Sequence, residues 1–216
     1  MPTSPSLPGL DRLIAICQQH ALPCELLPPL AWTSGLKEFI AGEPLDPQLL
    51  AIYQRMGGAE LGPLSIAKPD LEWDGLIPWN MKLRRHDLTP FLASLSFAVE
   101  TGFSYYFATV PRLADSRGVQ PVVHVDGYEA HAVPVASSVD RFFDTYSRYL
   151  ELMVVDPGYI YSRVAEISFP WGVSQLIARD ETLMESIRAG RFDFLTDEDA
   201  EGHQWTQRLL SPHVED

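Results

Sequence analysis

Cysteine is scarce in this sequence: its 216 residues include only Cys17 and Cys24. Two cysteines exclude a disulfide-based scaffold, and a chain of this length can bury a core without such cross-links. His20 lies between the cysteines, but the spacing matches no common zinc pattern and no second pair of ligands follows. We therefore expect reduced thiols and no bound metal.

Long hydrophobic runs are also missing. No apolar stretch approaches the roughly 20 residues of a membrane-spanning helix. The N-terminal residues MPTSPSLPG contain neither the basic residue nor the apolar run of a secretory signal, and they carry no lipidation motif. These absences predict a soluble, cytoplasmic protein that has no membrane partner.

Basic residues are few relative to acidic ones. The chain has 16 lysines and arginines against 29 aspartates and glutamates, which gives a net charge of −13 at pH 7. Direct nucleic-acid binding is not expected, because it requires lysine and arginine side chains against the phosphates. An acidic surface can instead steer association with a basic protein partner.

Catalytic motifs are absent as well. The sequence contains no P-loop, no GxSxG, no HExxH and no Rossmann glycine pattern. We therefore expect no catalytic residues and no cofactor.

The sequence does contain one clearly delimited helix, in the stretch LDPQLLAIYQRMGGAELGPLSI. Asp46 is a good N-cap, and Pro47 suits the first helical position. Apolar residues then recur at helical spacing, and we expect Gly57 to end the helix in the left-handed conformation. Residues 61–66 should form a tight turn into a strand.

Strand-like sequence is concentrated in the middle of the chain. Residues 91–110 and 121–135 hold branched and aromatic runs that are interrupted by the turn signals Thr101–Gly102 and Asp126–Gly127. Helical periodicity marks residues 9–20, 33–42 and 138–156. In the last of these we expect Ser138 to cap the helix and a wide apolar stripe to lie against the sheet. We interpret residues 68–87 as a long loop with a short helix or strand.

Together these patterns predict an α+β fold. We expect an antiparallel sheet of about four to six strands packed with N-terminal and C-terminal helices. Residues 1–155 should form this domain, and residues 156–216 should form a C-terminal helical extension packed on it.

The Asp126–Gly127 turn raises an alternative function. A two-residue turn would place Val125 opposite Tyr128, and His124, Glu129 and His131 would then share one face of the sheet. Two histidines and a carboxylate could bind a metal or act in acid–base catalysis. Cross-strand polar pairs on a solvated sheet face give the same pattern, however. A metal-dependent enzyme that uses these three residues therefore remains an alternative.

Three stretches carry a family resemblance. LDPQLLAIYQRMGGAELGPLSI resembles the helix, glycine pair and first strand of the SUKH superfamily, which contains the Syd protein and the fungal cell-wall-synthesis regulators. VVHVDGYEAHAVPVASSVDRFFDTYSRYL is similar to that family's last strands and to the helix that packs on its sheet. The C-terminal DETLMESIRAGRFDFL is similar to the tails of longer members. The resemblance covers about Leu45 to Met153.

This resemblance implies a non-enzymatic interaction domain, with no catalytic residues to carry over. In bacteria such domains commonly serve as immunity proteins that bind and neutralise a polymorphic toxin, often a nuclease. An acidic inhibitor can place carboxylates where the toxin would bind phosphates. A cytosolic regulatory or scaffold protein with a non-toxin partner is the alternative.

One acidic stretch is the favoured partner-binding site. Asp70, Glu72, Trp73 and Asp74 combine carboxylates with an aromatic anchor in a single expected loop. The acids between residues 193 and 201 are the second choice.

Overall fold

The computed structural model describes residues 6–29, 39–40, 42–69, 75–196 and 200–211. The strands in these ranges are β1 (Cys24–Leu26), β2 (Phe39–Ile40), β3 (Glu43–Pro44), β4 (Ala59–Leu61), β5 (Leu64–Ile66), β6 (Leu95–Glu100), β7 (Tyr105–Thr109), β8 (Val122–Asp126) and β9 (His131–Ala136). The α-helices are α1 (Pro8–Gln19), α2 (Pro47–Arg55), α3 (Leu76–Arg84), α4 (Thr89–Ala93), α5 (Val139–Val155), α6 (Pro157–Ser162), α7 (Ser174–Ile177), α8 (Glu181–Arg188), α9 (Asp193–Thr196) and α10 (Ala200–Leu210).

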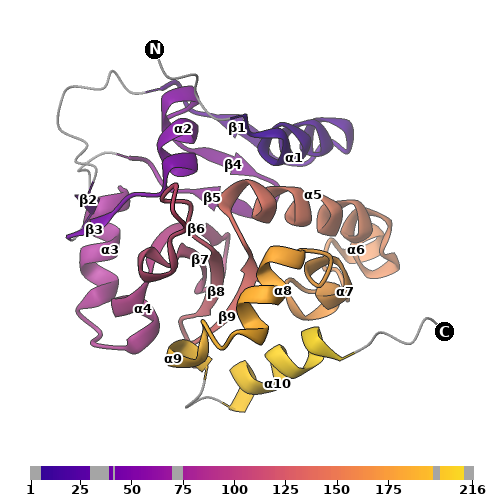
Figure 1. The fold of residues 1–216 in the computed structure, drawn as a ribbon. Helices are drawn as coiled ribbons and strands as arrows, with labels where there is room; N and C mark the ends of the chain where they lie inside the picture. The colour runs from indigo at the N-terminus through magenta and orange to yellow at the C-terminus, as the bar shows by residue number, and fades with distance from the viewer. Residues whose placement is uncertain (1–5, 30–38, 41, 70–74, 197–199, 212–216) are drawn as a thin grey trace.

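Seven of the strands form one open antiparallel sheet in the order β1–β4–β5–β6–β7–β8–β9, and β2 pairs separately with β3 (Figure 1). Consecutive strands from β4 to β9 are neighbours, so this part of the sheet is a meander that needs no crossover connections. The α+β class is confirmed, but the expected four to six strands were too few.

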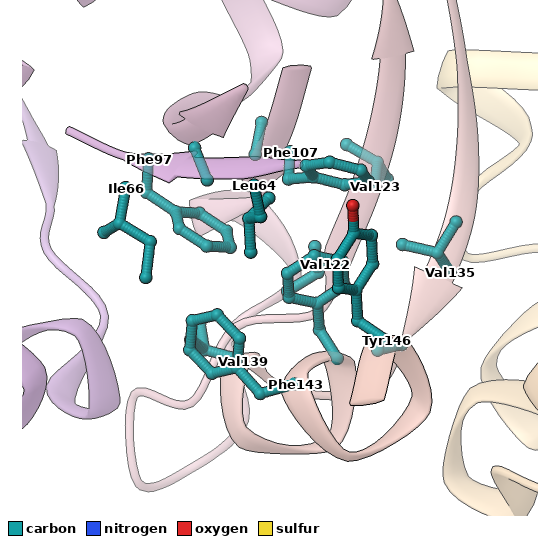
Figure 2. Packing of buried hydrophobic residues seen from close by; sticks show 14 of the residues in the cluster. Leu64, Ile66, Phe97, Phe107, Val122, Val123, Val135, Val139, Phe143 and Tyr146 are labelled. Carbon is teal, nitrogen blue, oxygen red and sulfur yellow. The ribbon is translucent and has the colours of Figure 1, made fainter. Parts of the chain in front are cut away.

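The main core lies between the sheet and α5. The Ser138 hydroxyl caps α5 as expected, because it accepts a hydrogen bond from the Arg141 N–H. The ring of Phe107, from β7, packs 4.7 Å from the ring of Phe142 on α5. Figure 2 shows Phe107 facing Phe143 and Tyr146 across this layer. The sheet face that carries Phe107 is therefore filled by the helix.

The delimited helix is α2, and Asp46 and Pro47 begin it as predicted. The buried Asp46 carboxylate accepts hydrogen bonds from the N–H groups of Gln48 (2.7 Å), Leu49 (3.2 Å) and Gln120 (2.7 Å). One side chain thus holds the start of α2 against the residues that lead into β8. The predicted end was wrong: Met56 is extended, and Gly58 rather than Gly57 has a positive φ, of 123°.

Two other expectations need correction. Residues 59–66 form the hairpin β4–β5, so β4 was missed. Phe39 and Ile40 belong to strand β2 and not to a helix. Strands of two or three residues are too short to show a period, so these elements leave little signal in the sequence. The short helix or strand expected within residues 68–87 is helix α3.

Helix α1 lies beside α5 in Figure 1 and uses a cap supplied by that helix. The N–H groups of Gly9 and Leu10 donate to Oδ1 of Asp140, in the first turn of α5, over 2.9 and 3.2 Å. A Cβ atom at position 9 would overlap the carbonyl oxygen of Asp140. The two helix starts therefore meet where only glycine fits.

The C-terminal helices α9 and α10 contact β9, the last strand of the sheet (Figure 1). The Trp205 Nε1–H donates to the carbonyl oxygen of Pro134 over 2.8 Å, and the Trp205 ring lies edge-on against Trp171. A backbone acceptor on the edge strand is thus satisfied by a side chain of α10. The division of the chain at residue 155 stays a prediction.

Candidate functional site

One row of side chains crosses five strands on the face opposite α5. In register, Glu25 of β1 lies opposite Glu60 of β4, Glu60 opposite Ser65 of β5, Ser65 opposite Val99 of β6, and Val99 opposite Tyr106 of β7. Directly paired residues point to the same face of a sheet, and Tyr106 alternates with the core residue Phe107. The row therefore lies on the face that α5 does not cover.

These side chains form the floor of a groove of about 570 Å³. Trp79 and Lys82 of α3 form one wall, and Leu27 and Lys68 also line it. The Trp79 ring packs on the Tyr106 ring with centroids 5.5 Å apart. Helix α3 thus covers the β6–β7 part of this face, and the groove occupies the part over β1, β4 and β5.

Asn80 holds α3 in this position. Its Nδ2 donates to the carbonyls of Leu76 and Ser96 over 2.8 Å each, and its Oδ1 accepts from the Ser96 N–H over 2.8 Å. Ser96 lies at the irregularity in the β6–β7 register, where the strand leaves backbone groups for a side chain to bind. Two buried hydrogen bonds to Ser96 therefore fix the groove wall to the sheet, and the bond to Leu76 lies within α3 itself.

The floor of the groove carries two carboxylates side by side. Like charges directly opposite each other on neighbouring strands repel. The Ser65 hydroxyl donates to Glu60 Oε1 over 2.6 Å, which orients that carboxylate within the groove. The surface can thus present negative charge next to the indole of Trp79 and the phenol ring of Tyr106.

The favoured residues Asp70, Glu72, Trp73 and Asp74 lie outside the described residues. The structure does describe the residues on either side of them. Lys68 forms a parallel bridge with Gly75, and the Leu76 N–H donates to the Lys68 carbonyl over 2.7 Å. Lys68 also lines the groove. Glu25, Glu60 and Tyr106 were not singled out from the sequence, because their convergence depends on pairing between strands of three residues.

The second acidic set is only partly described. Residues 197–199 lie outside the described ranges, while Asp193 belongs to α9 and Glu201 to α10. Glu201 Oε2 lies 3.2 Å from His131 Nε2, so this acid contacts the sheet domain.

The expected register around Asp126–Gly127 was wrong. Asp126 pairs with His131 and His124 with Val133, so the turn spans residues 127–130 and not two residues. The Asp126 carboxylate accepts the N–H groups of Tyr128 (2.7 Å) and Glu129 (3.2 Å), and this side-chain turn replaces the tight Asp–Gly turn.

His124, Glu129 and His131 therefore do not form the expected surface trio. Glu129 is exposed in the turn, while both histidines are buried. The His124 ring packs between Tyr105 and Phe107, and neither ring nitrogen has a hydrogen-bond partner among the described residues. Burial lowers the pKa of His124 to about 3, so its imidazole is neutral at pH 7.

The other metal candidate involves the two cysteines. Cys17 is buried in α1 and Cys24 lies in β1, and both thiols are free. Burial raises the pKa of the Cys17 thiol to about 12. Within the described ranges, no group of three or more His, Cys, Asp and Glu residues could hold a metal ion.

Comparisons with models of protein families, with curated proteins and with solved structures found no significant match to this chain. In the part of the chain that the structure describes, no helix has the length and apolar character needed to span a membrane.

Proposed function

We propose that this chain is a non-enzymatic protein-binding module and that its partner docks in the groove over β1, β4 and β5. The observation that carries the proposal is the row Glu25–Glu60–Ser65–Val99–Tyr106 on the sheet face opposite α5, where the described helices leave the part over β1, β4 and β5 open. Adjacent carboxylates beside aromatic rings suit a basic partner, because charge steers the encounter and aromatic side chains supply anchors.

The partner class follows from the SUKH resemblance and the net charge of −13. The order of elements, with a capped helix, an antiparallel sheet and then a helix packed on that sheet, is the order on which the resemblance rests. We infer that the partner is a basic toxin domain, such as a nuclease, which the module neutralises by occupying its anion-binding surface.

The test is a pull-down in which the tagged chain captures proteins from its host. The captured proteins are washed first at low salt and then at high salt. The bait is compared with Glu25→Lys/Glu60→Lys, which replaces both carboxylates of the groove with ammonium groups. Glu129→Lys/Glu185→Lys is the matched control, because it makes the same change in net charge at exposed sites outside the groove.

The expected result is a basic protein that is released by salt, is inhibited by the natural chain and the control, and is neither bound nor inhibited by the groove variant. Equal binding by both variants would place the interface elsewhere. A retained partner without toxic activity would favour the regulatory alternative, and no salt-sensitive partner at all would refute the protein-binding proposal.

A further inference from the structure

A second cleft, of about 870 Å³, lies at the far end of the β6–β7 hairpin. It is bounded by the turn after Glu100, by the C-terminal half of α5, by α6, and by residues 163–169. Glu100 and Tyr105 alternate with the row that floors the groove, so their side chains project to the α5 side of the sheet. Glu100 and Tyr105 therefore face away from the proposed partner-binding floor, although Glu25 and Glu60 border both the groove and the cleft.

Aromatic rings from four parts of the chain line the cleft. Phe103, whose side chain is 53% exposed, stacks on Tyr105 with an interplanar angle of 10° and a centroid distance of 5.4 Å. On the opposite side, Tyr149 of α5 packs 5.6 Å from Phe169, and Tyr159 of α6 completes the wall. The negative faces of aromatic rings around an open volume attract cations.

Glu100 supplies a carboxylate in the midst of these rings. Its carboxylate makes no hydrogen bond or ion pair with any residue that the structure describes, and the residue is partly buried. Burial raises its pKa to about 7. An ionised carboxylate in such a setting is normally paired with a cation, because its desolvation is otherwise uncompensated.

The cleft's own cation does not fill this role. The guanidinium of Arg163 lies over the Tyr159 ring, 5.4 Å from its centroid, and forms no ion pair with Glu100. Glu25 and Glu60 also border the cleft, so negative charge exceeds positive charge along its lining. A neutral or anionic ligand would bury Glu100 further without compensating its charge, whereas an organic cation would pair with it and pack against the rings.

We propose that this cleft binds a small organic cation, a substituted ammonium group on an apolar body, with Glu100 as the counter-ion and the aromatic rings as the surrounding cage. Glu100 and the aromatic rings of this site lie outside the proposed protein-binding groove, with which the cleft shares Glu25 and Glu60. The ammonium group could belong to a free amine or to a lysine side chain, and the two sources are distinguished by the choice of probe.

The probe is benzyltrimethylammonium, titrated into the full chain by calorimetry, with benzyl alcohol as the neutral comparison and a blocked lysine amide as the side-chain mimic. Glu100→Gln keeps the shape but removes the charge, and we expect it to weaken binding of the cation about tenfold. Glu129→Gln makes the same charge change in an exposed turn and should leave binding unchanged. Phe103→Leu should lower the affinity for benzyltrimethylammonium severalfold, because the variant lacks an accessible aromatic ring.

Binding should also depend on pH through Glu100. With a pKa of about 7, roughly a tenth of this carboxyl is ionised at pH 6 and nine tenths at pH 8, so affinity for the cation should rise about tenfold between these values. Glu100→Gln should show no such rise. The titratable and charged groups that face Glu100 or share the cleft are Cys24, Glu25, Glu60, Tyr105, Tyr146, Tyr149, Tyr159 and Arg163.

Three results would overturn the proposal: no binding of either cation at millimolar concentration, equal binding of benzyl alcohol and benzyltrimethylammonium, or equal binding by the natural chain and Glu100→Gln. Tighter binding of the lysine mimic, with the same dependence on Glu100, supports the ammonium chemistry and assigns it to a polypeptide. Retention of the salt-sensitive partner by Glu100→Gln would separate this site from the protein-binding groove.

Discussion

At the scale of single residues, the buried histidine His124 shows how a polar side chain can belong to the core. Its ring contacts Tyr105 and Phe107 and finds no hydrogen-bond partner among the described residues. Its position opposite Val133 puts it on the face that α5 covers. His124, which the sequence offered as a metal ligand, is therefore a core residue that packs against aromatic rings. Its burial makes the stability of the fold depend on pH.

Replacing His124 should make the protein less sensitive to acid. In the unfolded chain the imidazole titrates near pH 6.5, but in the folded chain its pKa is about 3. Between these values the unfolded state binds more protons, so stability falls as the pH drops below 6.5. His124→Leu should abolish this term, which is worth about 2 kcal/mol at pH 5 relative to pH 8.

Urea denaturation at pH 5 and pH 8 measures this difference in the free energy of unfolding. His203→Leu, at an exposed position on α10, serves as the control and should keep the natural pH dependence. An unchanged pH dependence in His124→Leu would mean that the pKa of His124 is the same in the folded and unfolded chain.

At the scale of elements, helix starts are joined to distant parts of the chain by their caps. Asp46 caps α2 and also binds the Gln120 N–H, while Asp140 in α5 caps α1. The Asp140 N–H in turn donates to the Gln48 side chain in α2, over 2.9 Å. These bonds tie three helices and one strand entrance together, so local capping signals also determine tertiary contacts.

Asp46→Ala should cost more stability than an ordinary cap mutation. It removes the acceptor for three N–H groups and leaves that of Gln120 buried, so we expect a loss of about 2–3 kcal/mol in the free energy of unfolding. Ser138→Ala removes a single bond at the start of α5 and should cost about 1 kcal/mol. Chemical denaturation at pH 8 compares the two, and equal losses would show that the bond to Gln120 contributes nothing.

Gly9→Ala should destabilise the protein although alanine favours helices. Helix propensity alone predicts a gain of about 1 kcal/mol. The added methyl group would overlap the backbone of Asp140, so α1 must shift away from α5 and we expect a net loss of at least about 2 kcal/mol. Thermal unfolding measures the effect. Ala15→Gly, at an exposed position on the same helix, measures the effect of helix propensity alone. Stabilisation by Gly9→Ala would refute the close contact between position 9 and the backbone of Asp140.

At the scale of the whole molecule, the C-terminal helices protect one end of the sheet. Residues of α9 and α10 contact β9, and Trp205 is fully buried there. An uncovered edge strand offers unpaired backbone groups to other chains. The C-terminal region therefore has a structural role that is distinct from any role in binding.

A chain that ends at Arg191 should associate more strongly with itself than the full chain, because β9 loses this cover. Analytical ultracentrifugation across a range of concentrations measures the change. Trp205→Phe keeps an aromatic ring but loses the bond to the Pro134 carbonyl, so it should cost about 1 kcal/mol without added association. A truncated chain with the association state of the full chain would show that β9 is protected in another way.

The sequence was sufficient where the signal is local. The Asp46–Pro47 start of α2, the Ser138 cap of α5 and the apolar stripe of α5 depend on residues within a few positions, and all three were predicted. The α+β class and the pairing of β6 with β7 followed from the same kind of pattern. A local hydrogen bond or a local period is specified by neighbouring residues, so no tertiary information is needed.

Only the tertiary structure decided the strand count, the register of β8 against β9, and the convergence of Glu25, Glu60 and Tyr106 in one groove. Strands of three residues are too short to show a period. The Asp126–Gly127 sequence predicted a two-residue turn, but the hydrogen bonds of the Asp126 side chain stabilise a longer one. The isolation of Glu100 among aromatic rings likewise depends on β6, α5 and α6 meeting in space. Such sites arise from pairing and packing between distant segments, which the order of residues alone does not specify.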